Sequence, residues 1–172
     1  MLDQVDNYQA LYGALMFDVE AAIDALAGSD TQFNRRSYVR TVFALIEGET
    51  YLRKQYALMM HDLGMIRLSD PEVALLREEQ YKLNNKGEPS TQQLFLRLAE
   101  NLRYSFRIDA KVHGREYKFE TQGHEWESFL KAIAIRHRIT HPKQFEDFEI
   151  SDTDLSIVHT VLKWYHKNRQ SR

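Results

Sequence analysis

An arginine and two histidines stand close together late in the chain. Arg136 is followed directly by His137, and four residues separate Arg136 from His141. A guanidinium group binds phosphate oxygens through paired hydrogen bonds, and an imidazole takes up or releases a proton near neutral pH. These residue types predict a site that acts on a phosphodiester, and this is the segment in which we expect chemistry.

The same segment carries a signal for the end of a helix. Pro142 disfavours helical geometry at the residue before it, which is His141. Side chains five positions apart on an ideal helix point about 140° apart, so Arg136 and His141 would diverge on a continuous helix. If the helix unwinds near Thr140, His141 can swing back toward Arg136, and the proline then helps to assemble the site.

A structural interpretation of these residues stays open. Short arginine–histidine patterns also arise by chance, and a second one joins Arg107 to His113. Basic residues in the last turn of a helix complement the helix dipole, and a proline commonly follows the end of a helix.

The spacing of apolar residues predicts a chain made mainly of helices. Three prolines and seven glycines leave room for long ones. We expect helices near residues 8–27, 32–61, 71–83, 90–102, 124–141 and 152–165, with a surface loop at 84–90. Alternating apolar and polar residues predict a small β-hairpin insert within 106–120. The fold class is therefore all-α, in a single domain over residues 1–172.

Composition narrows the classes of function. The formal net charge is -2, which argues against nonspecific coating of nucleic acid but allows one small basic pocket. The absence of cysteine excludes disulfides, thiolate metal sites and a cysteine nucleophile. No apolar run is long enough for a membrane helix, and the acidic start does not resemble a signal peptide. We expect a cytoplasmic protein with no membrane association.

The segment Ala-Ile-Arg136-His137-Arg-Ile-Thr-His141-Pro-Lys, which follows Trp126 and Phe129, resembles the signature of HEPN domains. In that family an arginine, usually followed by a polar residue, precedes a histidine by four to six residues. The earlier stretch 35–48 also resembles a helix of HEPN proteins from toxin–antitoxin and abortive-infection systems. The family commonly has Asn or Asp where this chain has His137.

The resemblance implies a HEPN-like helical bundle and a metal-independent endoribonuclease that needs no cofactor. It also implies a homodimer in which two motifs face each other, with RNA as substrate and an antitoxin or other regulatory protein as a further partner. His141 would act as general base or acid, and His137 would either take the complementary proton role or serve as a structural donor. Arg136 would stabilise the charge that builds on the phosphate.

Four further residues are candidates for RNA binding or support of the site: Arg40, Glu47, Arg138 and Lys143. Arg40 and Glu47 lie seven residues apart on one face of the expected second helix, where they could orient Arg136. An ordinary structural ion pair is the alternative for them. The alternative to catalysis is a non-catalytic HEPN-like module that binds a nucleotide, RNA or a partner protein.

Overall fold

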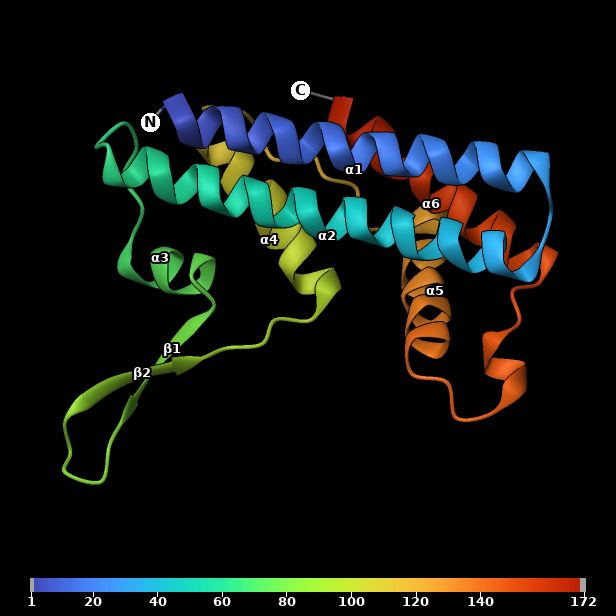
Figure 1. Ribbon diagram of the computed structural model, residues 1–172. Helices are drawn as coiled ribbons and strands as arrows, with labels where there is room; N and C mark the ends of the chain where they lie inside the picture. The colour runs from blue at the N-terminus through green and yellow to red at the C-terminus, as the bar shows by residue number, and fades with distance from the viewer. Residues whose placement is uncertain (1, 171–172) are drawn as a thin grey trace. The chain divides into compact units, whose positions relative to one another are not determined.

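The computed structural model describes the backbone of residues 2–170 and the side chains of residues 6–169 (Figure 1). This part of the chain is 71% helical, with six α-helices and one two-stranded antiparallel sheet. The predicted all-α class with a small β-hairpin is confirmed. None of the described helices combines the length and the apolar character needed to cross a membrane. In chain order the elements are α1 (Leu2–Gly28), α2 (Gln32–Asp62), α3 (Asp70–Leu76), β1 (Glu79–Leu83), β2 (Pro89–Gln93), α4 (Leu98–Val112), α5 (Gly123–Thr140), the 3-10 helix η1 (Phe145–Phe148) and α6 (Asp152–Gln170).

The chain divides into two compact units. The first contains the described residues of 1–49 and 120–172, and the second contains residues 50–119. The long helix α2 runs through the boundary, so its first half belongs to one unit and its second half to the other. The expectation of one domain over residues 1–172 stays a prediction, and each unit is described by itself.

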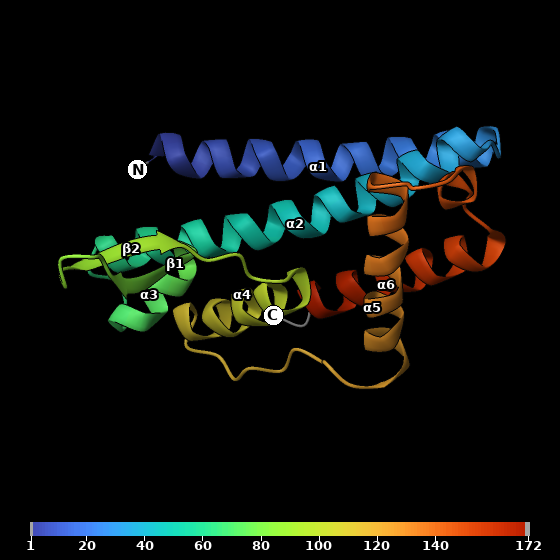
Figure 2. The same ribbon diagram turned by 90° about the horizontal axis from the view of Figure 1, so that it is seen from below.

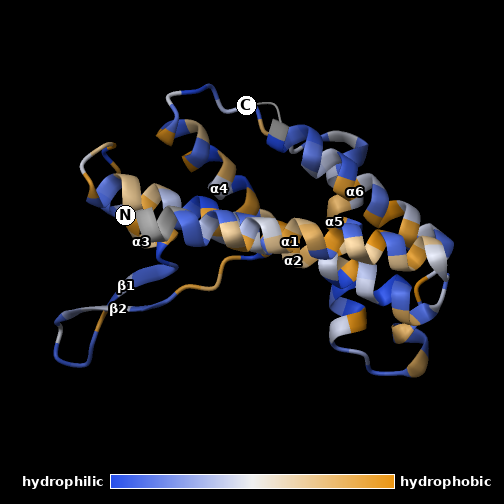
Figure 3. Cartoon of the chain, turned by 45° about the horizontal axis from the view of Figure 1, so that its top comes forward, coloured by the Kyte–Doolittle hydropathy of each residue, from blue (hydrophilic) through white to orange (hydrophobic). Residues whose placement is uncertain are grey.

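The hairpin prediction was right in kind and wrong in place. The strands β1 and β2 pair antiparallel, with Leu83 opposite Pro89, around the segment that we expected to be a surface loop. Gly87 in this turn has a positive φ of 77°. The helix expected at 71–83 ends earlier, at Leu76, and the helix expected at 90–102 begins later, at Leu98, because the strands take residues 79–83 and 89–93. Figure 3 shows the two strands coloured mostly hydrophilic. They therefore lack the alternation of apolar and polar residues from which a strand is predicted.

Residues 106–112, predicted as a strand, belong to helix α4. Phe106 and Ile108 are buried there together with Leu102 and Ser105. Leu102, Ser105 and Phe106 follow the three- and four-residue spacing of a helix face, and this longer stripe prevails over the short alternation after it. The remaining residues of the expected hairpin, 113–120, form the turn at Gly114 and an irregular connection.

A small apolar cluster forms the core of the second unit. Its buried members are Ala57, Leu58, Leu68, Leu76 and Ile108. The break after α3 occurs at Glu78, whose φ of 56° is unusual for a residue other than glycine. Lys54 is 2% exposed, and its Nζ lies 2.6 Å from Glu78 Oε1 and 3.1 Å from Asn101 Oδ1. This ion pair between a buried lysine and a half-buried glutamate holds the residue at which the chain turns from α3 into β1.

Aromatic packing fixes α5 within the first unit. Phe129 of α5 is fully buried, and its ring lies 6.5 Å from Phe43 of α2 and 5.4 Å from Trp164 of α6, between ring centroids. Trp126, one turn earlier, lies 5.8 Å from Trp164 in an edge-on contact. Figure 2 shows α5 crossing α6, the helix with which it makes this contact. The end of α5 is therefore carried by a rigid core.

A buried carboxylate joins α2 to the end of α6 in the same unit. Glu49 is 4% exposed and accepts a hydrogen bond from the Tyr165 hydroxyl at 2.7 Å and one from Arg169 Nη1 at 2.9 Å. Tyr12 of α1 also bonds to Arg169, so the cluster reaches a third helix. Burial, together with the nearby Arg169 charge, lowers the pKa of His166 below its ordinary value of 6.5, against the opposing effect of Glu49.

Replacing Phe129 by alanine should destabilise the protein by about 3–5 kcal/mol, because it removes a fully buried ring and leaves a cavity. The matched control is Leu130→Ala, at a neighbouring side chain that is 46% exposed, for which we expect a change within about 1 kcal/mol. Urea unfolding followed by circular dichroism measures both. Equal losses in the two variants would contradict the packing of α5 described above.

The lowered pKa of His166 predicts a pH dependence of stability. The unfolded state binds a proton on this residue more readily than the folded state does, so the free energy of unfolding rises with pH. The contribution is complete above about pH 6.5 and is lost as the pH falls through the lowered value. His166→Gln should flatten this slope in urea melts at a series of pH values. Superimposable pH profiles for the two proteins would refute the prediction.

Candidate functional site

The last turn of α5 ends where the sequence predicted. The helix stops at Thr140, and His141 has φ -128° and ψ 58°, outside helical geometry. The His141 backbone N–H still donates to the His137 carbonyl at 3.0 Å, and the Thr140 hydroxyl donates to the Arg136 carbonyl at 2.7 Å. Pro142 explains the departure, because its ring crowds the residue before it.

The two histidines come together on the outside of this turn. The ring centroids of His137 and His141 lie 5.0 Å apart with an angle of 52° between the rings, and both residues are exposed. We expected His141 to swing back toward Arg136, and its ring contact is instead with His137. The site therefore offers two neighbouring imidazoles to the solvent.

Arg136 is held by a carboxylate from α2. Its Nη2 lies 2.9 Å from Glu47 Oε1 and 3.2 Å from Oε2, and the two side chains are 34% and 39% exposed. The contact uses one of the three guanidinium nitrogens, so Nη1 and Nε keep their donors for a ligand. This is the contact expected if Glu47 orients Arg136, and it also fits the alternative of an ordinary structural ion pair.

Arg40 acts on the helix end rather than on Arg136. Its Nη2 donates to the Ile139 carbonyl at 3.2 Å, which is one of the carbonyls left without a partner at the end of α5. Its guanidinium carbon lies 6.0 Å from the centroid of the Phe148 ring, and Arg36 lies over the same ring at 4.8 Å. Arg40 therefore stabilises the turn that carries His141 by a hydrogen bond to the Ile139 carbonyl.

Arg138 is occupied by contacts within the protein. Its Nη1 donates to the carbonyls of Glu146, Asp147 and Glu149 at 3.2, 3.2 and 2.7 Å, and its Nη2 lies 3.0 Å from Asp154 Oδ2. These bonds hold the loop around η1 against α5. These contacts of Arg138 are structural. They differ from the RNA-supporting role that was expected for this residue.

Lys143 follows the histidine pair on the exposed loop. Its backbone N–H donates to Asp147 Oδ2 at 2.8 Å, and Asp147 also accepts from the backbone of Gln144. The Asp147 carboxylate therefore shapes the loop after Pro142. Sequence reasoning missed Asp147 and Phe148, although the polar residue three positions after Gln144 is the pattern of a cap at the start of a helical turn.

Comparison with family models, with curated proteins and with solved structures gives no match for this chain. Among the side chains that the structure describes, no group of three or more His, Cys, Asp or Glu residues is arranged to hold a metal ion. The functional conclusion therefore depends on the residues of the site and on their geometry.

Two arginines on the same helix should respond differently to removal of their charge. Arg138→Met removes the hydrogen bonds from Arg138 to three carbonyls and to Asp154, and we expect a loss of about 1–3 kcal/mol. Arg136→Met breaks one partly exposed ion pair, which contributes less than about 1 kcal/mol. Chemical denaturation of both variants compares them directly. A greater loss in Arg136→Met would contradict the two contact sets.

Proposed function

We propose that this protein is a metal-independent endoribonuclease of HEPN type that cleaves RNA at the Arg136–His141 turn. The observation that carries the proposal is the exposed pair of imidazoles, with ring centroids 5.0 Å apart, which begins at the residue directly after an arginine whose guanidinium is only partly engaged. Two imidazoles supply a base and an acid near neutral pH, and the guanidinium binds the phosphate between them.

The reaction follows from these three side chains. One imidazole, which we assign to His141, takes the proton from a ribose 2′-hydroxyl as its oxygen forms a bond to phosphorus. The bond from phosphorus to the 5′-oxygen breaks, and His137 gives that oxygen a proton. The products are a 2′,3′-cyclic phosphate and a free 5′-hydroxyl. DNA lacks the attacking hydroxyl and would not be cut.

Arg136 would stabilise the charge that develops on the phosphate oxygens. Glu47 accepts from Nη2, so Nη1 or Nε can donate to a phosphate oxygen while the guanidinium keeps its orientation. A preset orientation matters because a donor that is already in place needs no rearrangement during the reaction. Glu47 is therefore a positioning residue in this proposal, and Arg40 supports the turn through Ile139.

The proposal also covers the oligomeric state of the protein, its location and its biological role. The histidine pair is open to solvent in one protomer, and a homodimer that brings two such turns together would enclose the RNA. We place the protein in the cytoplasm, as the toxin or effector of a defence or toxin–antitoxin pair, with an antitoxin or regulatory protein as its partner. These assignments rest on the resemblance of the Arg136–His141 segment to HEPN domains.

Cleavage of a labelled single-stranded RNA in excess EDTA tests the activity. The wild-type protein should cut, with a bell-shaped pH dependence, because one imidazole must be neutral and the other protonated. His141→Ala and His137→Ala should each slow cleavage by about 10²–10⁴-fold. Arg136→Met should slow it by about 10²–10³-fold with little loss of folding stability.

The matched control is His124→Ala, which removes an exposed histidine from the opposite end of the same helix. It should cut at the wild-type rate, whereas a contaminating ribonuclease would cut equally in all the variants. Cleavage that survives in the His137→Ala/His141→Ala double variant would refute the proposal. RNA binding that needs Arg136 but leads to no cleavage by the wild type would instead select the non-catalytic binding module.

A further inference from the structure

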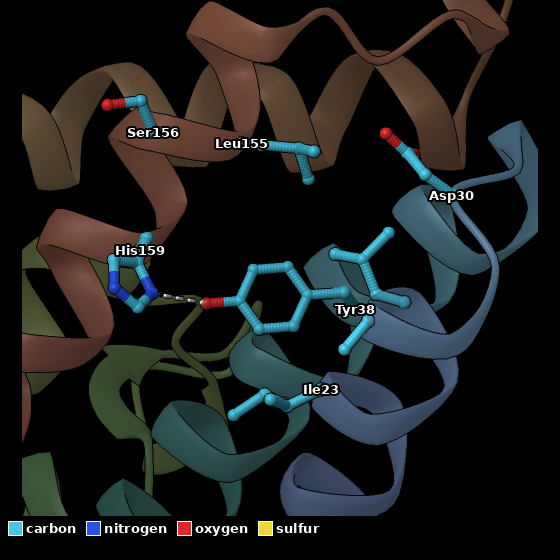
Figure 4. A pocket seen from close by; sticks show the side chains of 8 residues that line it. Ile23, Asp30, Tyr38, Leu155, Ser156 and His159 are labelled. Carbon is cyan, nitrogen blue, oxygen red and sulfur yellow. Dashed lines mark hydrogen bonds between the residues drawn. The ribbon is translucent and has the colours of Figure 1, made fainter.

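A pocket in the first unit lies away from the turn that carries His137 and His141. It has a volume of about 440 Å³ and lies among α1, α2 and α6 (Figure 4). Its lining residues are Ile23, Leu26, Ala27, Asp30, Tyr38, Leu155, Ser156 and His159. None of them belongs to the candidate site described above. The volume lies within the range of about 300–1,000 Å³ that is typical of small-molecule sites.

The walls of this pocket keep apolar surface in contact with water. Ile23 is 40% exposed, and Leu26 and Leu155 are half-buried. Figure 4 shows the Tyr38 ring between Leu155 of α6 and Ile23 of α1. Covering these side chains with an apolar ligand is favourable because it removes their surface from water.

One buried polar group opens onto this apolar surface. Tyr38 is 3% exposed, and its hydroxyl lies 3.5 Å from His159 Nδ1, at the outer limit of a hydrogen bond. A phenolic hydroxyl can donate one hydrogen bond and accept others, so this long contact leaves capacity for a ligand. Burial raises the pKa of Tyr38 to about 12, so the hydroxyl stays protonated and able to donate.

Asp30, the carboxylate that lines the pocket, is engaged by an arginine at the rim. Asp30 Oδ1 lies 2.5 Å from Arg35 Nε, and Asp30 Oδ2 accepts a hydrogen bond from Arg35 Nη2 at 2.6 Å. Arg35 Nη2 also lies 2.7 Å from Asp152. A cationic ligand would have to displace Arg35 from Asp30, and an anionic ligand would find Arg35 already shared by two carboxylates. Either would lose its hydration, whereas an uncharged ligand would lose little.

We propose that this pocket binds a small, uncharged, mainly apolar molecule whose single polar group hydrogen-bonds with the Tyr38 hydroxyl. The three helices supply the apolar walls, and Tyr38 supplies the specificity. The site is independent of the proposed ribonuclease activity, because it shares no residue with the Arg136–His141 turn.

Fluorine NMR of four probes tests the ligand class on the full chain. The probes are 4-fluorotoluene, 4-fluorophenol, 4-fluorobenzoate and 4-fluorobenzylamine, which share a ring and differ in polarity and charge. We expect line broadening that saturates with protein concentration for the two neutral probes, tighter binding for the phenol, and none for the two charged probes. Absence of saturable binding by both neutral probes, or equal binding of a charged probe, would overturn the proposal.

Variants locate the binding. Ala27→Leu places a larger side chain in the pocket and should weaken both neutral probes by roughly tenfold or more. Its matched control is Ala25→Leu, at an exposed position of α1 that does not line the pocket, which should bind as the wild type does. Equal binding by the two variants would place the probes elsewhere and refute the proposal.

Tyr38→Phe removes only the hydroxyl. It should weaken 4-fluorophenol by about threefold to tenfold and leave 4-fluorotoluene unchanged, because only the phenol uses the hydrogen bond. The circular-dichroism spectrum checks that the variant is folded. An unchanged preference for the phenol in this variant would overturn the role of Tyr38.

Discussion

The packing of Phe129 against Phe43 and Trp164 is the interaction on which the candidate site depends. Phe129 is fully buried, and it fixes both the depth and the rotation of α5 against α2 and α6. Arg136 follows Phe129 by seven residues, so the two lie on the same face of α5. Glu47 follows Phe43 by four residues, so these two lie on the same face of α2. The aromatic contact therefore sets the register in which Arg136 meets Glu47.

Arg136 and Arg138, in the last turns of α5, make different contacts because their side chains point in different directions. Arg138 faces the loop around η1 and gives its donors to three carbonyls and Asp154. Arg136 faces α2 and gives one nitrogen to Glu47. The first set of contacts shapes the protein, and the second leaves donors that can meet a phosphate. A basic helix end is thus both a structural feature and a candidate site, with the two functions on separate residues.

Local signals in the sequence were enough to place most helices and the end of α5. Pro142 restricts its neighbour, and Ser69 with Glu72 forms a capping box at the start of α3. The hairpin was misplaced because alternation over 106–112 was read without the helical stripe that begins at Leu102, while β1 and β2 have too little buried surface to give a pattern. The Glu47–Arg136 contact joins residues 89 positions apart. Helix periodicity placed Arg40 and Glu47 on one face as candidates to orient Arg136, but it could not tell which of the two makes the contact.

The central claim is that RNA is cut by attack of its own 2′-oxygen at the Arg136–His141 turn. The most direct measurement is mass spectrometry of the ends produced from an RNA with one cleavable site, beside the same RNA with a 2′-deoxy sugar at that site. The account predicts a 2′,3′-cyclic phosphate and a 5′-hydroxyl from the first RNA and no product from the second. A 5′-phosphate end, or cleavage of the 2′-deoxy substrate, would contradict it.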